Sequence, residues 1–99
     1  MKSSDAQHLL RTIDQGVAFH FCNGGQARNL SELLAGVASL SDEQYRHHVY
    51  FDHNDFSNWL LDIIGDDKLG LDIFGLKKQT TLRLIKARIL YLTHRATSF

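Results

Sequence analysis

A length of 99 residues with 43% hydrophobic and 22% charged side chains is typical of one small folded domain and excludes a chain that is disordered throughout. The 11 basic and 11 acidic side chains cancel, so binding to nucleic acid or to a membrane surface would need a local patch. One cysteine excludes an internal disulfide, and no apolar run approaches the roughly 18 residues of a membrane span. We expect a single cytoplasmic domain over residues 1–99, with its core at about 17–92 and no membrane partner.

The N-terminal part of the sequence predicts a helix over residues 4–13, capped by Ser4, and then a β-hairpin. Residues 17–22 alternate between apolar and other side chains, with Phe19 and Phe21 on one face, as in a strand. An Asn-Gly-Gly turn follows, and Asn-Gly tolerates the positive φ angles of a tight hairpin. A hairpin of two strands is marginal alone, so we expect its phenylalanine face to lie on helices.

Two capping boxes predict the next helix starts. Asn29 is followed three residues later by Glu32, and Ser41 is followed at the same spacing by Gln44. In each pair, the first side chain accepts from a free backbone N–H of the first helical turn. The helix after Ser41 should run to about residue 49 or 50.

A clear amphipathic face follows the cap at Asn54 or Asp55. Its apolar residues recur at i, i+3, i+4, i+7 and i+8, which is helical spacing, and Gly65 stands where a helix commonly ends. A short helix at 67–74 and a long one at 79–94 complete the chain. We therefore predict an α+β, mainly helical fold in which an N-terminal β-hairpin packs on four to five short helices. The expected core comprises Phe19, Phe21, Leu33, Leu34, Val37, Tyr45, Val49, Phe56, Trp59, Leu60, Ile63, Leu82, Ile85 and Ile89.

The order His48-Val49, Asn54-Asp55-Phe56, Trp59 and Gly65-Asp66 resembles a family of small archaeal and bacterial domains of unknown function. These domains share a pattern of the form His-Val … Asn-Asp-Phe-x-x-Trp … Gly-Asp, and the likeness covers residues 17–92. The family has no assigned activity and occurs both alone and fused to other modules. The resemblance therefore implies domain boundaries and no catalytic residue. Gly70 departs from expectation, since a better helix former would suit the helix at 67–74.

Metal binding is one alternative function, through His47, His48, His53 and Asp55, because imidazole and carboxylate are zinc ligands. Adjacent histidines on a helix point about 100° apart, however, and the spacing matches no strong zinc signature. The competing interpretation is structural: His48 packs at a helix joint, and Phe19, Phe21, Phe56 and Trp59 fill the core around it. The indole N–H of a buried Trp59 would then need an acceptor, either His48 or a backbone carbonyl.

Nucleic-acid binding is a further alternative, through a basic face of the last helix made either by Lys78 and Arg88 with Arg95 or by Arg83 and Lys86. The plainer interpretation is that this basic helix packs beside the aspartate-rich stretch before it, where the opposite charges compensate. His20 and Cys22, two apart on a strand, are the minimum for a nucleophile and its base, but no third orienting group is evident.

No complete catalytic set is visible, and no cofactor is implied. The leading hypothesis is a small non-catalytic protein-interaction module that binds a partner protein or a second copy of itself.

Overall fold

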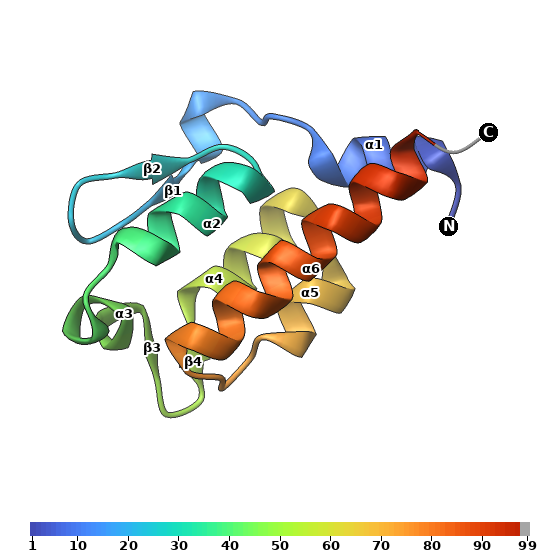
Figure 1. Cartoon of the computed structure of the whole chain (residues 1–99). Helices are drawn as coiled ribbons and strands as arrows, with labels where there is room; N and C mark the ends of the chain where they lie inside the picture. Colours follow the sequence, from blue (N-terminus) through green and yellow to red (C-terminus); the bar gives the residue numbers. More distant parts are fainter. Residues whose placement is uncertain (98–99) are drawn as a thin grey trace.

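The computed structural model describes residues 1–97 and confirms an α+β, mainly helical fold (Figure 1). The α-helices are α1 (Ser3–Leu10), α2 (Leu30–Ser39), α3 (Asp42–His48), α4 (Asp55–Trp59), α5 (Asp67–Asp72) and α6 (Lys78–Ala96). Two antiparallel hairpins pair β1 (Phe19–His20) with β2 (Gln26–Ala27), and β3 (Val49–Tyr50) with β4 (His53–Asn54). Among residues 1–97, no helix combines the length and the apolar character needed to cross a membrane.

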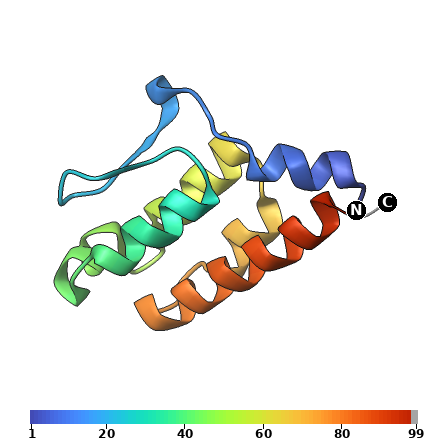
Figure 2. The same ribbon diagram turned by 45° about the horizontal axis from the view of Figure 1, so that its top comes forward.

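The long helix α6 organises the other elements. It runs beside α2, and α1 crosses its C-terminal end (Figures 1 and 2). The helices α4 and α5 contact each other, and α5 also contacts α6. The first hairpin lies along α2, and the second lies near the start of α6 (Figure 1). The helix α1 and the end of α6 are neighbours, since the side-chain amide of Gln7 donates to the Ala96 carbonyl at 3.2 Å.

The first hairpin is present, but its strands are shorter than the alternating pattern predicts. Phe19 pairs with Ala27, and Val17 lies before the strand in a 3-10 turn, where it is exposed. Within the turn, Gly24 has a φ of 95°, whereas Asn23 contributes its side chain, which accepts from the Gly25 N–H at 3.1 Å. The Asn-Gly pair therefore supplies one left-handed residue and one side-chain acceptor.

Local capping signals located the middle helices correctly. Asn29 and Ser41 cap α2 and α3, and Gln44 completes the second capping box. Glu32 differs slightly from expectation, because its carboxylate accepts from the N–H of Arg28, one residue before the cap. At the N-terminus, α1 begins after Lys2, so Ser4 lies inside the helix and does not cap it.

Between α3 and α5 the backbone departs from the predicted pair of plain helices. α3 ends at His48, and the chain reverses through the β3–β4 hairpin. α4 then continues into a π-helix at Leu60–Ile64, which ends at Gly65 with a φ of 87°. The Arg11 guanidinium donates to the carbonyls of Ile63 and Ile64, at 3.0 Å each. These two carbonyls, which lack partners within the last turn of the helix, are thereby hydrogen-bonded.

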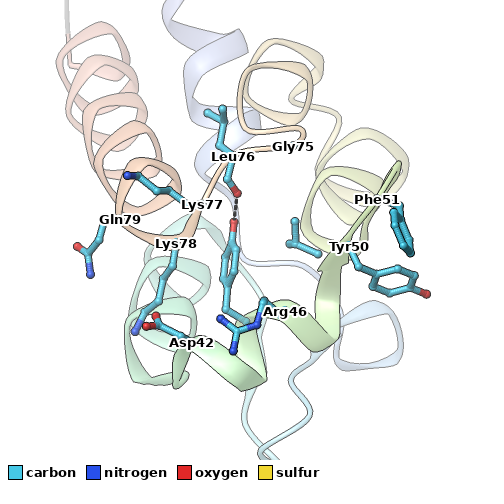
Figure 3. A pocket seen from close by; sticks show the side chains of 11 residues that line it. Asp42, Arg46, Tyr50, Phe51, Gly75, Leu76, Lys77, Lys78 and Gln79 are labelled. Carbon is cyan, nitrogen blue, oxygen red and sulfur yellow. Dashed lines mark hydrogen bonds between the residues drawn. The ribbon is translucent and has the colours of Figure 1, made fainter.

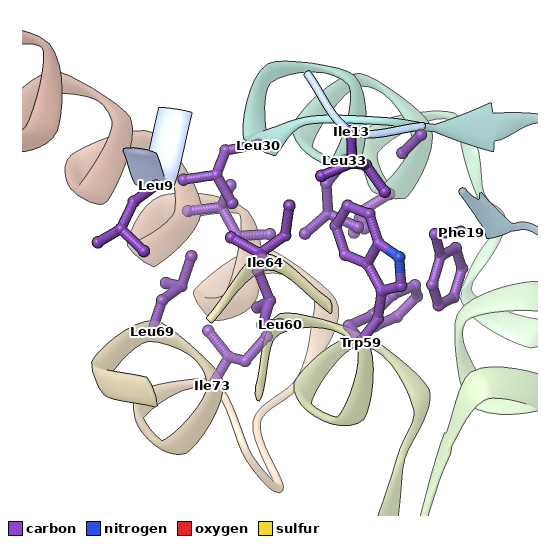
Figure 4. Close-up of a cluster of buried hydrophobic side chains, with 14 of the residues drawn as sticks. Leu9, Ile13, Phe19, Leu30, Leu33, Trp59, Leu60, Ile64, Leu69 and Ile73 are labelled. Carbon is purple, nitrogen blue, oxygen red and sulfur yellow. The ribbon is translucent and has the colours of Figure 1, made fainter. Parts of the chain in front are cut away.

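The core lies where the first hairpin, α2, α4 and α6 meet. Phe19, Phe56 and Trp59 are buried there, and Figure 4 shows the indole of Trp59 beside the Phe19 ring. The indole N–H donates to the carbonyl of Val17 at 2.9 Å. Five residues expected in the core, Leu34, Val49, Ile63, Leu82 and Ile89, are only partly buried and pack at its margin.

Two glycines permit close packing between elements. A Cβ on Gly36 would lie 2.1 Å from a carbon of the Phe21 ring. The first hairpin can therefore pack closely on α2 only because residue 36 has no side chain. A Cβ on Gly70 would lie 2.9 Å from Cγ of Leu61. The glycine that departs from helix-forming expectation therefore lets α5 lie close to the preceding helix.

Gly36→Ala tests this packing. In an exposed helix the change would stabilise by about 0.5–1 kcal/mol, but here the overlap with Phe21 should lower the free energy of unfolding by roughly 1–3 kcal/mol in urea denaturation. Ala38→Gly, at an exposed position of α2, is the matched control and should lose about 1 kcal/mol through helix propensity alone. A more stable Gly36→Ala variant would contradict the packing of Phe21 on α2.

Candidate functional site

His48 ends α3 and is buried with 5% of its surface exposed. Its Nδ1 lies 2.9 Å from Oδ2 of Asp55, and its Nε2 accepts from the backbone N–H of Cys22 at 3.0 Å. Since Nε2 accepts, the hydrogen bonds assign the ring proton to Nδ1, which donates to the carboxylate. Both nitrogens of His48 are therefore used in joining the first hairpin to the start of α4.

The other candidate metal ligands are arranged around Asp55. Its second oxygen lies 2.5 Å from Nε2 of His53, whose ring stacks on Tyr50 with centroids 4.7 Å apart. His47 is exposed, and its ring meets that of His48 edge-on. Within residues 1–97, no three His, Cys, Asp or Glu side chains are grouped as metal ligands. Asp55 thus brings His48 and His53 together as a hydrogen-bonded chain.

Cys22 and His20 are both exposed on the first hairpin. The thiol of Cys22 points to the carbonyl of Gln44, with Sγ and O 3.7 Å apart. The buried imidazole of His48 is near, but the lone pair of its Nε2 is occupied by the backbone N–H of Cys22. A catalytic thiol needs a base positioned to take its proton, and among residues 1–97 no hydrogen bond joins the Cys22 thiol to the imidazole of His20 or of His48.

The predicted basic face of α6 is divided by internal contacts. Arg88 forms a two-pronged ion pair with the buried Asp66, at 2.9 and 3.0 Å. Lys78 donates to the Leu40 carbonyl at 2.5 Å, and Arg95 donates to the carbonyl of Met1. Arg83 and Lys86 are exposed. The five cations therefore do not form one continuous surface.

A groove that the sequence did not reveal lies between α3, the second hairpin and the start of α6 (Figure 3). Its volume is about 480 Å³, which is large enough for a few side chains of a ligand. Its lining comprises Asp42, Tyr45, Arg46, Val49, Tyr50, Phe51 and residues 75–79. We call this the tip groove.

Tyr45 forms the buried wall of the tip groove. Its hydroxyl donates to the Leu76 carbonyl at 2.8 Å and, with its one proton used, accepts from the Thr81 hydroxyl at 2.7 Å. Burial raises the pKa of Tyr45 above its usual value of about 10, and the hydrogen bond with Thr81 offsets part of that increase. The two contacts hold the segment before α6 against α3.

The rim of the tip groove carries the most exposed large apolar side chain among residues 1–97. Phe51 is 99% exposed and has a φ of 49°. It is the first of two residues that join Tyr50 to its partner His53, a turn position that favours Gly, Asn or Asp. Tyr50 beside it is 50% exposed, and the two rings meet edge-on with centroids 6.5 Å apart. The aromatic pair Tyr50 and Phe51, at the end of the second hairpin, is named the aromatic tip.

A second groove, more apolar and about 590 Å³ in volume, lies between α5 and α6 near Met1. Its charged side chains are already compensated, because Lys68 pairs with Asp72 at 2.8 Å and Arg88 pairs with Asp66. It offers no net charge to select a partner.

Comparison with known proteins finds no family model, curated protein or solved structure that matches this chain. The resemblance to small archaeal and bacterial domains stays a prediction.

His48→Phe tests the structural role of the imidazole. Phenylalanine keeps a planar aromatic ring but removes the hydrogen bonds to the Cys22 N–H and the Asp55 carboxylate, so the free energy of unfolding should fall by roughly 2–4 kcal/mol. His47→Phe, on the neighbouring exposed residue, should change it by less than about 0.5 kcal/mol. Equal losses in the two variants, measured in urea, would contradict the assigned hydrogen bonds.

Tyr45 makes the stability of the fold sensitive to alkaline pH. Above pH 10 the unfolded chain loses the phenol proton while the folded chain keeps it, so the free energy of unfolding should fall as pH rises through that range. Tyr45→Phe should flatten the fall between about pH 9 and 11, whereas Tyr50→Phe at the exposed tip should retain it. An unchanged slope in Tyr45→Phe would show that burial of this hydroxyl is not its source.

Proposed function

We propose that this protein is a non-catalytic protein-interaction module and that it docks through the aromatic tip and the tip groove. The observation that carries the proposal is Phe51, a bulky side chain held at positive φ and left in water. A left-handed conformation costs about 1–2 kcal/mol for a residue other than glycine. Strained residues of this kind are concentrated at functional sites.

Binding of a partner would bury the Phe51 side chain, which the fold leaves exposed to water. Burying a phenylalanine side chain against a partner contributes roughly 1.5–3 kcal/mol, which offsets the backbone cost of presenting it. Aromatic side chains that protrude from a rigid scaffold are frequent centres of binding energy in interfaces. The groove beside the ring supplies a concave surface, so the partner can contact both a protruding and a recessed feature.

The alternatives receive less support from the geometry. The thiol of Cys22 contacts the Gln44 carbonyl, and both nitrogens of the His48 imidazole are hydrogen-bonded, which weighs against catalysis or metal binding at the histidine cluster. We also propose a cytoplasmic location, because the one cysteine is exposed and forms no disulfide.

Phe51→Asn separates function from folding. Asparagine tolerates the left-handed region, so the variant should be more stable by about 1 kcal/mol, which corresponds to a rise of roughly 4–8 °C in melting temperature. The same change removes the ring and should abolish docking. Leu90→Asn, at an exposed site on α6, is the matched control for loss of an exposed apolar side chain and should leave docking intact.

Docking is measured with a phage library of random dodecapeptides, selected on the immobilised wild-type protein. We expect enriched peptides that bind wild type and Leu90→Asn but lose at least about tenfold in affinity for Phe51→Asn. If no enriched peptide depends on Phe51, the proposed function is wrong.

A further inference from the structure

We infer that the tip groove binds an acidic peptide segment of a partner protein, with an apolar side chain between its carboxylates. This inference deepens the proposed docking function and rests on it. It follows from the charges and the apolar surface that the groove brings together in a protein whose formal net charge is zero.

The tip groove has a positive balance. Arg46, Lys77 and Lys78 line it, against the single carboxylate of Asp42 (Figure 3). Across residues 1–97, neither Arg46 nor Lys77 takes part in an ion pair, in contrast to the paired charges of the groove between α5 and α6. The first turn of α6, which begins here, also holds no acidic residue that would offset these cations. Two uncompensated cations are therefore available to a ligand that carries carboxylates.

The tip groove also has an apolar part. Val49 and Leu76 contribute aliphatic surface, and the Tyr45 ring forms the buried wall behind them. Because the hydroxyl of Tyr45 is already satisfied by Leu76 and Thr81, its ring presents an apolar surface to the groove. A ligand that places one apolar side chain here can reach Arg46 and Lys77 with flanking carboxylates.

A protein segment suits this surface better than a nucleic acid does. Binding to a phosphate backbone draws on many cations, whereas here Arg46 and Lys77 share the groove with the carboxylate of Asp42, and Asp52 follows Phe51 in the turn of the second hairpin. A peptide can place its carboxylates beside Arg46 and Lys77 and keep them away from the aspartates. The exposed rings of the aromatic tip could also stack on bases, so nucleic acid is included as an outcome of the test.

The experiment uses the Phe51-dependent peptides from the library. We expect them to be enriched in Asp and Glu around an apolar residue and to weaken when the salt concentration rises from about 0.05 M to about 0.5 M. Affinity, measured by fluorescence anisotropy of the labelled peptides, should fall at least about tenfold in Arg46→Glu/Lys77→Glu. Arg83→Glu/Lys86→Glu, an equal change of charge on the exposed face of α6, should bind as the wild type does.

Each failure has a distinct meaning. Phe51-dependent peptides that are neutral or basic, or that bind both double variants equally, would overturn the acidic ligand and leave the docking function standing. Tighter binding of labelled oligothymidylate than of the peptides, with the same dependence on Phe51 and Lys77, would replace the peptide by nucleic acid. A Phe51-dependent dimer in analytical ultracentrifugation would make a second copy of the chain the occupant.

Discussion

The buried imidazole of His48 is the contact on which the arrangement of the first hairpin, α3 and α4 depends. Its ring lies among those of Phe19 and Phe56, with centroids 5.3 and 5.2 Å away, while its two nitrogens join the Cys22 backbone to the Asp55 carboxylate. A polar ring in an apolar cluster is stable only if both nitrogens have partners. The same hydrogen bonds that permit its burial also occupy both ring nitrogens, so neither is free to bind a ligand.

Several residues of the pattern on which the family was predicted join short elements of the structure. Asn54 caps α4 and donates to the Ile73 carbonyl, and Asp66 caps α5 while pairing with Arg88. Trp59 donates to the Val17 carbonyl in the 3-10 turn before the first hairpin, and Gly65 supplies the left-handed residue that ends the π-helix. These residues fix the joints between short elements. Tyr50 and Phe51 of the aromatic tip are not part of this pattern.

The helix starts could be predicted because their signals are local: a side chain and the backbone N–H that it caps are three residues apart. The second hairpin could not, because strands of two residues have no period to recognise. Helical spacing grouped Arg88 with Lys78 and Arg95 on one face of α6, because periodicity carries no information on partners elsewhere in the chain, such as Asp66 for Arg88. The tip groove joins α3 to the start of α6, a contact between segments about 30 residues apart that only the fold defines.

The central claim is that His48 is a structural acceptor and donor with no free nitrogen. Long-range ¹H–¹⁵N correlation spectra of the imidazole, with a search for coupling across the hydrogen bond between the Cys22 N–H and Nε2, test it most directly. We predict a proton on Nδ1, an unprotonated Nε2 and a detectable coupling to Cys22. A proton on Nε2, or a shift of either nitrogen on addition of zinc, would contradict the account.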